Sequence, residues 1–368
     1  MNNFTSKLDE KLTLRSGITL PNRIAMAPLT NNQSNSDGTL HEDEFQWLTK
    51  RAGNFGLIST CAAFVSQEGR AWEGQLGISN DKHLPGLVRF SEALIKAGSV
   101  PIIQLHHAGI KAELAQEKIS TIDSGDARGA TQSDIERIIC DFTLAAQRAE
   151  HAGFMGVEVH GANGYLFTQF LSPQDNPRDD LYGGNLEGRA RFLRQTVQSI
   201  RNATSSNFMI SVRISPLDTW DHRGLLISDS IKLAQWLTAD GVDIIHLSLK
   251  DASGPPPFEK NVVPVVRSIR DAIPNKVKIA VAGGIRTRED ARKAESAGAD
   301  IVVIGKASIV HPDWPRVSKS NDFVPISAPW DPNYLHQVSV GPKFVKYLQR
   351  IPGLVLGGMP SKPVRVQQ

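Results

Sequence analysis

The sequence of 368 residues predicts an α/β protein built as a (β/α)₈ barrel, the TIM-barrel fold. Short apolar runs rich in β-branched residues alternate with longer segments of helical periodicity, which is typical of βα units around a parallel sheet. Eight such runs can be counted along the chain. A doubly wound open sheet is the main alternative, but no Gly-x-Gly-x-x-Gly follows the first run. Eight repeats therefore favour the barrel.

The predicted elements follow one another in regular order. Strands are expected at residues 23–26, 57–60, 101–105, 156–159, 209–214, 244–247, 278–281 and 301–304. Helices are expected at 41–52, 84–96, 133–151, 186–202, 228–240, 263–271 and 288–297. The helix over 133–151 has the clearest limits, because Thr131 and Ser133 offer capping hydroxyls at its start and Gly153 suits the turn at its end. Repeated junctions of this kind favour one continuous body.

We expect a single domain over residues 1–368, with the barrel at about residues 20–317. Loop insertions are expected at 121–131, after the third strand, and at 253–260, where three prolines follow one another. From about residue 318 to 368 the pattern weakens. That part is expected to be a peripheral C-terminal extension or a frayed tail.

Composition narrows the class of protein. Hydrophobic residues make up 40% of the chain and charged residues 21%, as in soluble globular proteins. The net charge of +3 comes from 41 basic and 38 acidic residues, an excess too small to indicate a nucleic-acid surface. Cys61 and Cys140 are too few for a disulfide framework and fit a reducing compartment. With no secretory signal and no run near the ~18 apolar residues of a membrane span, we expect a cytoplasmic protein without membrane contact.

Three polar side chains follow the fourth predicted strand. His160 and Asn163 can donate hydrogen bonds to one oxygen of a bound molecule, and Tyr165 carries a proton that it could deliver to a neighbouring carbon. In a barrel, the active site lies at the carboxyl ends of the strands. The alternative is that His160 and Asn163 only cap the turn while Tyr165 packs the segment behind it.

Glycines after the seventh and eighth strands indicate a phosphate site. Gly283, Gly284 and Gly305 would expose backbone N–H groups at helix starts, and Lys306 would add a positive charge. Many barrels bind phosphorylated ligands at this place. The alternative is that the glycines serve tight turns alone.

Arg213 lies inside the fifth apolar run. A buried guanidinium stays charged and needs an anionic or strongly polar partner. That partner could be a cofactor that becomes anionic when reduced, or an internal acid such as Glu158. Elsewhere, His106 and His107 suggest a metal, but neighbouring residues on a strand point apart and no carboxylate triad accompanies them. No metal site is expected.

Taken together, these residues resemble a known family, the Old Yellow Enzyme flavoprotein ene-reductases, which are FMN-containing (β/α)₈ barrels. The resemblance spans about residues 10–350. Its motifs are Asn22-Arg23-Ile24-Ala25-Met26-Ala27-Pro28-Leu29-Thr30, the block 160–192, Val212-Arg213-Ile214-Ser215-Pro216, residues 281–285 and Pro312-Asp313-Trp314-Pro315. Because the pattern of the extra nucleotide-binding domains of larger relatives is not seen in these residues, we expect the single-domain type.

The resemblance implies a role for each candidate residue. The positions that match flavin-binding residues are Pro28, Leu29, Thr30, Ala62, Gln104, His160, Arg213, Gly283, Gly284, Gly305 and Lys306. Thr30 matches the residue that hydrogen-bonds flavin O4, Gln104 the one that reads the pyrimidine edge, and Arg213 the one beside N1 and O2. His160 and Asn163 match the pair that binds the substrate carbonyl oxygen, and Tyr165 matches the proton donor.

The implied function is an FMN-dependent NAD(P)H oxidoreductase that reduces the C=C bond of activated alkenes in a ping-pong cycle. Its partners would be non-covalent FMN, NADH or NADPH, and a small activated alkene. A second hypothesis keeps the flavin but makes the chain an oxidative amine dehydrogenase or demethylase. A third is a flavin-free phosphate-binding barrel, which rests on the glycine signal alone. A homo-oligomer is also compatible with the resemblance, with residues 340–348 as a contact near the active site.

Four positions depart from the family pattern. Lys306 replaces the usual arginine, which keeps the charge but loses the bidentate fork. His106 stands where Trp or Ala is common and is expected to shape the substrate pocket. Cys61 replaces an acid, and Ile110 replaces an arginine. These departures leave substrate preference and the affinity for FMN open.

Overall fold

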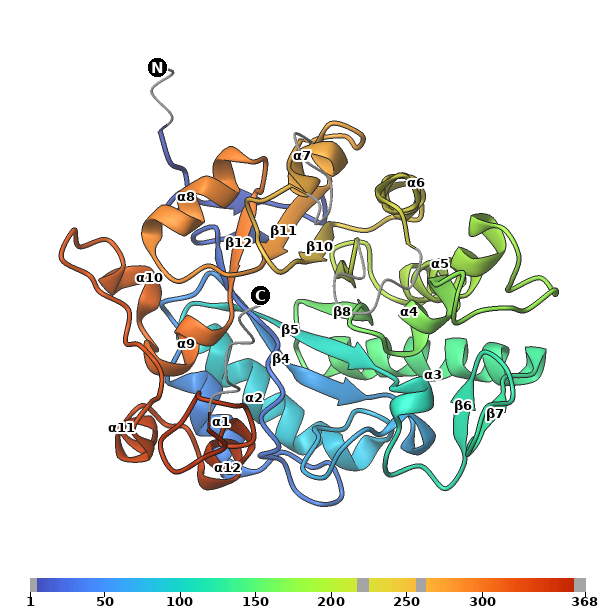
Figure 1. Cartoon of the computed structure of the whole chain (residues 1–368), viewed down its shortest axis with the longest axis horizontal. Helices are drawn as coiled ribbons and strands as arrows, with labels where there is room; N and C mark the ends of the chain where they lie inside the picture. Colours follow the sequence, from blue (N-terminus) through green and yellow to red (C-terminus); the bar gives the residue numbers. More distant parts are fainter. Residues whose placement is uncertain (1–4, 217–224, 256–262, 361–368) are drawn as a thin grey trace, which may run out of the picture.

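The computed structural model describes residues 5–216, 225–255 and 263–360. Eight parallel strands form a closed barrel, which confirms the predicted fold (Figure 1). In order around the barrel they are β3 (Ile24–Met26), β4 (Leu57–Phe64), β5 (Val100–His106), β8 (Gly156–Gly161), β9 (Met209–Ile214), β10 (Ile244–Ser248), β11 (Lys278–Ala282) and β12 (Ile301–Ile304). The pairing of β12 with β3 closes the sheet. Each of these strands corresponds to one of the eight predicted runs. The observed and predicted ends of most strands differ by a few residues.

Helices surround the barrel, and all seven predicted helices are present. They are α1 (Glu42–Thr49), α2 (Leu84–Lys96), α3 (Gln132–His151), α5 (Leu186–Ala203), α6 (Ile227–Ala239), α7 (Val265–Arg270) and α8 (Arg288–Ser296). Further helices are α4 (Leu166–Leu171), α9 (Lys306–Val310), α10 (Trp314–Val317), α11 (Pro332–Gln337) and α12 (Pro342–Leu348), with short 3₁₀ turns η1 (Gln67–Gly69), η2 (Asp81–His83) and η3 (Gly109–Lys111). Thr131 and Asp134 form a capping box at the start of α3, as the hydroxyl pattern indicated.

The expected loop at 121–131 is partly regular. β6 (Lys118–Ser120) and β7 (Ala127–Gly129) pair in parallel and stand outside the barrel. The sequence reading missed them because strands of three residues carry too little alternation to be recognised. Part of the second expected loop, at 253–260, lies outside the described residues.

An N-terminal hairpin covers one end of the barrel. β1 (Leu12–Thr13) pairs antiparallel with β2 (Thr19–Leu20), and its apolar side chains pack on the first residues of several barrel strands. Leu20 is fully buried there, together with Leu57, Met209 and Ile244. Since this end is closed by apolar packing, the carboxyl ends of the strands are left to form the site.

The chain after residue 317 is packed rather than frayed as far as residue 360. α12 lies beside α1, where the rings of Trp47 and Phe344 meet edge to face with centroids 5.0 Å apart (Figure 1). The buried guanidinium of Arg51 donates hydrogen bonds to the carbonyls of Ser308 and Ile309 and to that of Val338 in the C-terminal segment. The segment therefore forms part of the wall around the carboxyl ends of the barrel strands.

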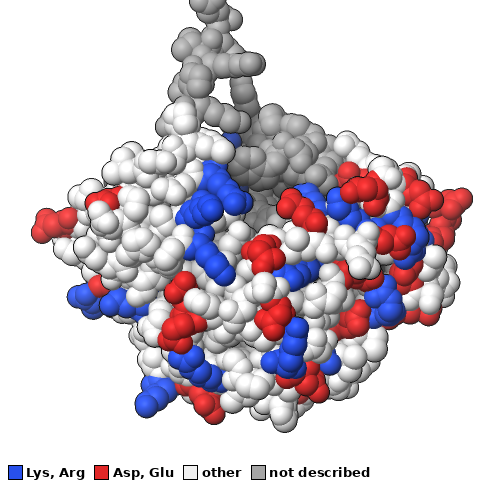
Figure 2. Space-filling view, turned by 90° about the horizontal axis from the view of Figure 1, so that it is seen from below, with Lys and Arg blue, Asp and Glu red and all other residues white. Residues whose placement is uncertain are grey.

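Charge on the face shown in Figure 2 is mixed, with acidic and basic side chains next to one another over most of it. In the described part of the chain, no helix has both the length and the apolar character to cross a bilayer.

Candidate active site

One cavity at the carboxyl ends of the strands brings together most of the predicted site residues. Its lining from the barrel consists of Pro28, Leu29, Thr30, Ala62, Trp72, Gln104, His160, Asn163, Tyr165, Arg213 and Lys306. Ile309 of α9 also lines the cavity, and the C-terminal segment adds Phe344, Tyr347, Leu348, Ile351 and Leu354. Sequence reasoning did not assign these residues. Residues 340–348, expected at a subunit contact, thus reach the cavity within the same chain.

His160 lies near the end of β8 and is almost completely buried. Burial, followed by nearby positive charge such as that of Arg213, holds the pKa of His160 well below its usual range. The imidazole is therefore neutral at physiological pH, with one N–H donor and one acceptor. Its buried Nδ1 has no hydrogen-bond partner among the described residues, so it is free to meet a ligand.

Asn163 sits in a left-handed backbone conformation with φ of 61°. Its backbone N–H donates to Ser215 Oγ at 3.0 Å, and its side-chain Oδ1 accepts from Ser248 Oγ at 3.2 Å. Ser248 in turn accepts a hydrogen bond from Arg213 at 2.9 Å. Because Oδ1 is occupied, the amide presents its Nδ2 donor to the cavity.

Tyr165 precedes α4, but its side chain makes no capping hydrogen bond. Its ring stands edge-on to His106, with centroids 4.4 Å apart, and lies 5.2 Å from the ring of His160. Burial raises the pKa of this phenol to about 12, so it keeps its proton at physiological pH. Tyr165 also packs against the small cluster of Ala71, Ala108 and Ala112, so these contacts are compatible with a packing role as well as with a chemical one.

A polar layer crosses the barrel below these residues. Glu158 accepts hydrogen bonds from Gln104 at 2.8 Å, Ser211 at 2.9 Å and His246 at 2.8 Å. Burial alone would raise the pKa of Glu158, but His246, Arg213 and Ser211 lower it to about 2. The carboxylate is therefore ionised, and it fixes the Gln104 amide so that its carbonyl oxygen remains an acceptor.

The contacts of Arg213 bear on both partners considered for it, a cofactor and Glu158. Burial lowers the pKa of Arg213, and the negative charge of Glu158 opposes that shift. The guanidinium donates a hydrogen bond to Ser248 Oγ. The buried Nε of Arg213 has no partner in the described part of the molecule. Buried donors are normally paired, so this N–H is available to a ligand or an ordered water. Ser211, His246 and Ser248 were missed in the sequence, although alternate polar positions in the apolar strands were a usable signal.

The glycine sites differ in what they require. Gly284 has a φ of +66°, a left-handed conformation that favours glycine. A Cβ on Gly283 would lie 2.7 Å from the carbonyl oxygen of Leu249, which is too close. Backbone geometry therefore explains both glycines without a phosphate. A Cβ at Gly305 would have no other atom within 4 Å, so the fold leaves room for a side chain there. Lys306 lines both the site cavity and an adjoining cavity that also holds Arg286. Arg286 is a second cation that the sequence reading did not include.

His106 is not among the side chains that line the cavity but lies directly behind two of them, so its expected role in shaping the substrate pocket stays a prediction. It is fully buried behind Tyr165, and its Nδ1 lies 3.1 Å from Gln75 Nε2. Burial lowers the pKa of His106 to about 3, so the ring is neutral. The His106 ring contacts two rings that do line the cavity, with centroid distances of 4.4 Å to Tyr165 and 5.4 Å to His160. We therefore expect it to act on the site by positioning these two side chains.

Two further departures from the family pattern, Cys61 and Ile110, also lie outside the cavity. Cys61 is buried and contacts the carboxyl of Glu44, with Sγ and Oε1 2.7 Å apart. Cys61 and Cys140 are both free thiols. Ile110 lines the entrance next to the site. Among the described residues, no group of three or more His, Cys, Asp and Glu side chains could hold a metal ion.

The fold and cavity define a class of protein. Gln104 offers an acceptor, Arg213 offers an unpaired buried donor, and Lys306 offers an exposed positive charge on the same cavity. This set fits a planar group with a polar edge and an anionic tail, as in FMN. Together with the donors at His160 and Asn163, it is the arrangement of a flavin-dependent barrel oxidoreductase.

Comparison with known proteins gives the family. The family model for NADH:flavin oxidoreductase / NADH oxidase matches residues 7–322. The chain is 34% identical over 332 residues to the probable NADH-dependent flavin oxidoreductase YqiG of Bacillus subtilis, covering 85% of this chain and 88% of that one. It is 33% identical over 335 residues to the NADPH dehydrogenase of Listeria innocua, covering 88% and 97%. The solved structure of the Old Yellow Enzyme homologue from Zymomonas mobilis matches with a TM-score of 0.79 at 25% identity, over 92% and 98% of the two chains.

The chain belongs to the NADH:flavin oxidoreductase / NADH oxidase family. It is therefore an FMN-dependent oxidoreductase of the NAD(P)H:flavin type.

Proposed function

We propose that this enzyme reduces the C=C bond of small activated alkenes, using electrons from NADH or NADPH. The observation that carries the proposal is the joint placement of His160, Asn163 and Tyr165 on one cavity. Two of them offer neutral donors for a carbonyl oxygen, and the third holds a proton beside it.

The cofactor would lie over the polar layer of the barrel. Pro28, Leu29, Thr30 and Ala62 would contact its ring system, and Gln104 and Arg213 would meet its polar edge. Gly283, Gly284, Gly305 and Lys306 would hold its phosphate. When bound, FMN accepts a hydride from the nicotinamide and returns one to the β-carbon of the alkene.

His160 and Asn163 would bind the activating oxygen of the substrate. Negative charge grows on that oxygen as the β-carbon is reduced, and two fixed N–H donors stabilise it without reorganisation. Each such donor contributes about 3 kcal/mol in the transition state. Ser248 holds Asn163 in the donating orientation, and burial keeps His160 neutral.

Tyr165 would protonate the α-carbon. Its pKa of about 12 keeps the phenol protonated across the working range of pH, so the proton is present when the charge develops. Its ring is fixed by edge contacts with His106 and His160, which aim the hydroxyl.

The test is steady-state turnover of the FMN-loaded protein with NADH and NADPH across neutral enones, nitroalkenes and maleimides. We expect alkene-dependent oxidation of the nicotinamide and ping-pong kinetics. Protein that binds FMN and is reduced by an amine without nicotinamide, but shows no alkene-dependent turnover, would instead establish the oxidative alternative. Protein that cannot be loaded with FMN would contradict the assignment of the cavity.

A further inference from the structure

Glu44 of α1 is a fully buried acid that the proposed reaction does not use. Its carboxyl group accepts hydrogen bonds from three uncharged side chains. The donors are Asn31 Nδ2 at 3.2 Å, Cys61 Sγ at 2.7 Å and the hydroxyl of Ser34. Burying a carboxyl group is costly unless it is hydrogen-bonded, so these three contacts are what stabilises the acid in the core.

The thiol of Cys61 is the donor in its contact with Glu44. Burial, followed by the nearby carboxyl group, holds the pKa of Cys61 well above its usual range, so Sγ keeps its proton. Burial also raises the pKa of Glu44, while the hydrogen bonds that it accepts oppose that shift. The carboxyl group of Glu44 is therefore the acceptor in all three contacts.

Two of the donors lie next to residues of the candidate active site. Asn31 directly follows Thr30, which lines the cavity. Cys61 directly precedes Ala62, which also lines it. The side-chain Oδ1 of Asn31 accepts from the backbone N–H of Gln33 at 3.0 Å, which fixes the turn that follows Thr30. One carboxyl group thus holds the loop after β3 to strand β4.

Strand β4 is irregular at the point where it meets Glu44. The register of its pairing with β5 shifts between Ser59 and Ala62, as in a β-bulge. A bulge changes the direction of the side chains that follow it. Cys61 contacts α1 while the next residue, Ala62, lines the cavity. The contact between Cys61 and Glu44 therefore fixes the bulge, and with it the place of Ala62.

The loop after β3 also reaches the segment that closes the cavity. Gln33 is fully buried, and its side-chain Oε1 accepts from the backbone N–H of Gly341 at 2.8 Å. Gly341 is the residue before α12, whose Phe344 and Tyr347 line the cavity. The contacts of Glu44 are thus continuous with both the barrel strands and the C-terminal wall of the site.

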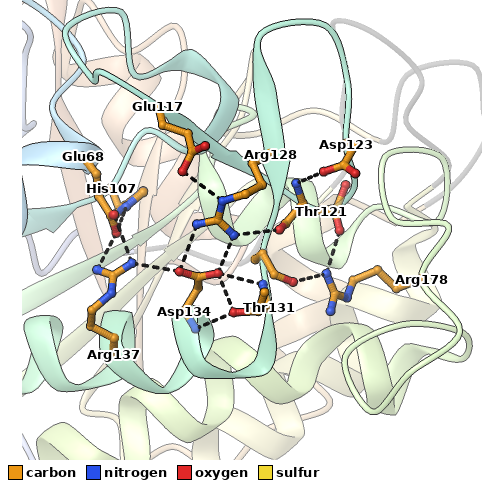
Figure 3. A network of polar contacts seen from close by, with 12 residues as sticks. Glu68, His107, Glu117, Thr121, Asp123, Arg128, Thr131, Asp134, Arg137 and Arg178 are labelled. Atoms are coloured by element: carbon orange, nitrogen blue, oxygen red, sulfur yellow. Dashed lines mark hydrogen bonds and ion pairs between the residues drawn. The ribbon is translucent and has the colours of Figure 1, made fainter.

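A second group of hydrogen-bonded acids differs from Glu44 in its partners and its place (Figure 3). Asp134 of α3 pairs with Arg128 at 2.7 Å and with Arg137 at 3.3 Å, and it forms the capping box with Thr131. The side chains of these ion pairs are partly exposed, and they do not line the candidate active site. Asp134 is therefore an acid that supports the fold away from the cavity.

We propose that Glu44 is a positioning residue for the flavin, because it holds Thr30 and Ala62 in the places where they meet the cofactor. Glu44 itself does not line the cavity, so it acts through these two segments. Residues that contact a ligand need a supporting set of hydrogen bonds to keep them within a fraction of an ångström of the productive geometry. The proposal rests on the proposed place of FMN over Thr30 and Ala62.

The test measures how tightly the full-length protein holds FMN. FMN-loaded wild type and variants are diluted, and the fluorescence of the released FMN gives the dissociation constant. The visible absorption spectrum of the bound FMN is recorded as well, because it reports the surroundings of the ring and not the stability of the fold.

Three variants change the contacts of Glu44, and two are controls. Glu44→Leu removes the acceptor at similar volume, Glu44→Gln keeps an acceptor oxygen, and Asn31→Ala removes the contact beside Thr30. Thr30→Val, which removes a hydroxyl proposed to meet the flavin, is the positive control. Asp134→Asn is the control for a general loss of stability.

We expect Glu44→Leu to raise the Kd for FMN by about tenfold and to change the spectrum of the bound flavin, as the loss of a supporting hydrogen-bond partner does at other ligand sites. Asn31→Ala should change both in the same direction by a smaller factor. Glu44→Gln should stay close to the wild type. Asp134→Asn should lower the unfolding temperature and leave the Kd and the spectrum unchanged.

Other results would overturn the proposal. A wild-type Kd and spectrum in Glu44→Leu and Asn31→Ala, with both changed in Thr30→Val, would show that Glu44 does not position the flavin site. Equal weakening by Glu44→Leu and Asp134→Asn would assign the effect to general stability. If Glu44→Leu does not fold, Asn31→Ala decides. If Thr30→Val changes neither quantity, the proposed place of FMN over Thr30 fails as well.

Discussion

Asn163 illustrates how single hydrogen bonds set the chemistry of the cavity. Its amide could face either way, and in the observed orientation Oδ1 accepts from Ser248 Oγ at 3.2 Å and, more weakly, from Ser215 Oγ at 3.5 Å. Ser248 itself is held by Arg213 at 2.9 Å. The Ser248 hydroxyl thus joins Asn163, which we propose binds substrate, to Arg213, which we propose binds the flavin.

Replacing Ser248 by alanine should weaken substrate binding selectively. We expect Ser248→Ala to lower kcat/KM for a neutral enone by about fivefold, which corresponds to the loss of one hydrogen bond of about 1 kcal/mol. The rate of flavin reduction by NADH should change less. Ser248→Thr, which keeps the hydroxyl, should restore most of the loss in a stopped-flow comparison of the two half-reactions. Equal losses in Ser248→Ala and Ser248→Thr would mean that the hydroxyl does not position Asn163.

Removing the phenol of Tyr165 should separate the two half-reactions further. We expect Tyr165→Phe to slow alkene reduction by about 10²- to 10⁴-fold, because a positioned general acid contributes on that order. Flavin reduction by NADH should stay close to the wild-type rate. Because the pKa of Tyr165 is about 12, the wild-type alkene step should show no loss from ionisation of this group up to about pH 10. Comparable losses in both half-reactions would refute the role of proton donor.

Among the elements, four neighbouring strands build the polar layer through their register. Gln104 on β5 pairs with Glu158 on β8, Glu158 pairs with Ser211 on β9, and Arg213 on β9 pairs with His246 on β10. Residues paired across parallel strands point to the same face, so the layer follows from the barrel pairing. A shift of one strand by one residue would turn its polar side chains out of the barrel.

The charge on Glu158 should make the protein acid-sensitive. The pKa falls from 4.5 to about 2 on folding, so the stabilisation is complete above about pH 4.5 and is lost as the pH falls toward 2. A shift of this size corresponds to about 3 kcal/mol. We expect Glu158→Gln to lower the free energy of unfolding in urea at pH 7, and to lower it much less at about pH 3. An equal effect at both pH values would show that the charge does not stabilise the fold.

Across the whole molecule, the two ends of the barrel carry different properties. The end at the amino termini of the strands, called the lower end, is filled by the hairpin of β1 and β2. The end at their carboxyl termini, called the upper end, holds the candidate active site. In barrels of this type, the first end serves stability and the second serves chemistry. The C-terminal segment with α12 connects the upper end to α1 and closes the cavity on one side.

A core substitution at the lower end should therefore cost stability and leave turnover unchanged. Leu20 is fully buried in the hairpin cluster, and Leu20→Ala should lower the free energy of unfolding by about 2–5 kcal/mol. The value of kcat for a neutral enone, measured well below the unfolding temperature, should match the wild type. A marked fall in kcat would show that the two ends are coupled.

The eight strands and seven helices were predictable because each is specified locally. Alternating apolar runs, capping residues such as Thr131 and glycines such as Gly153 act over a few neighbouring residues. The cluster at 160–165 was visible for the same reason, since its three polar side chains share one strand end. Short or irregular elements such as β6, β7 and the hairpin β1 and β2 lack enough local pattern to be found.

The sequence by itself determined the barrel, its order of elements and which residues lie at the strand ends. Only the tertiary structure decided that Ser248 orients Asn163, that His106 stands behind Tyr165, and that α12 closes the cavity. Ser248 and Asn163 are 85 residues apart, and their contact exists only after the barrel has closed. Side-chain partners across that distance depend on strand register and tilt, which no local pattern specifies.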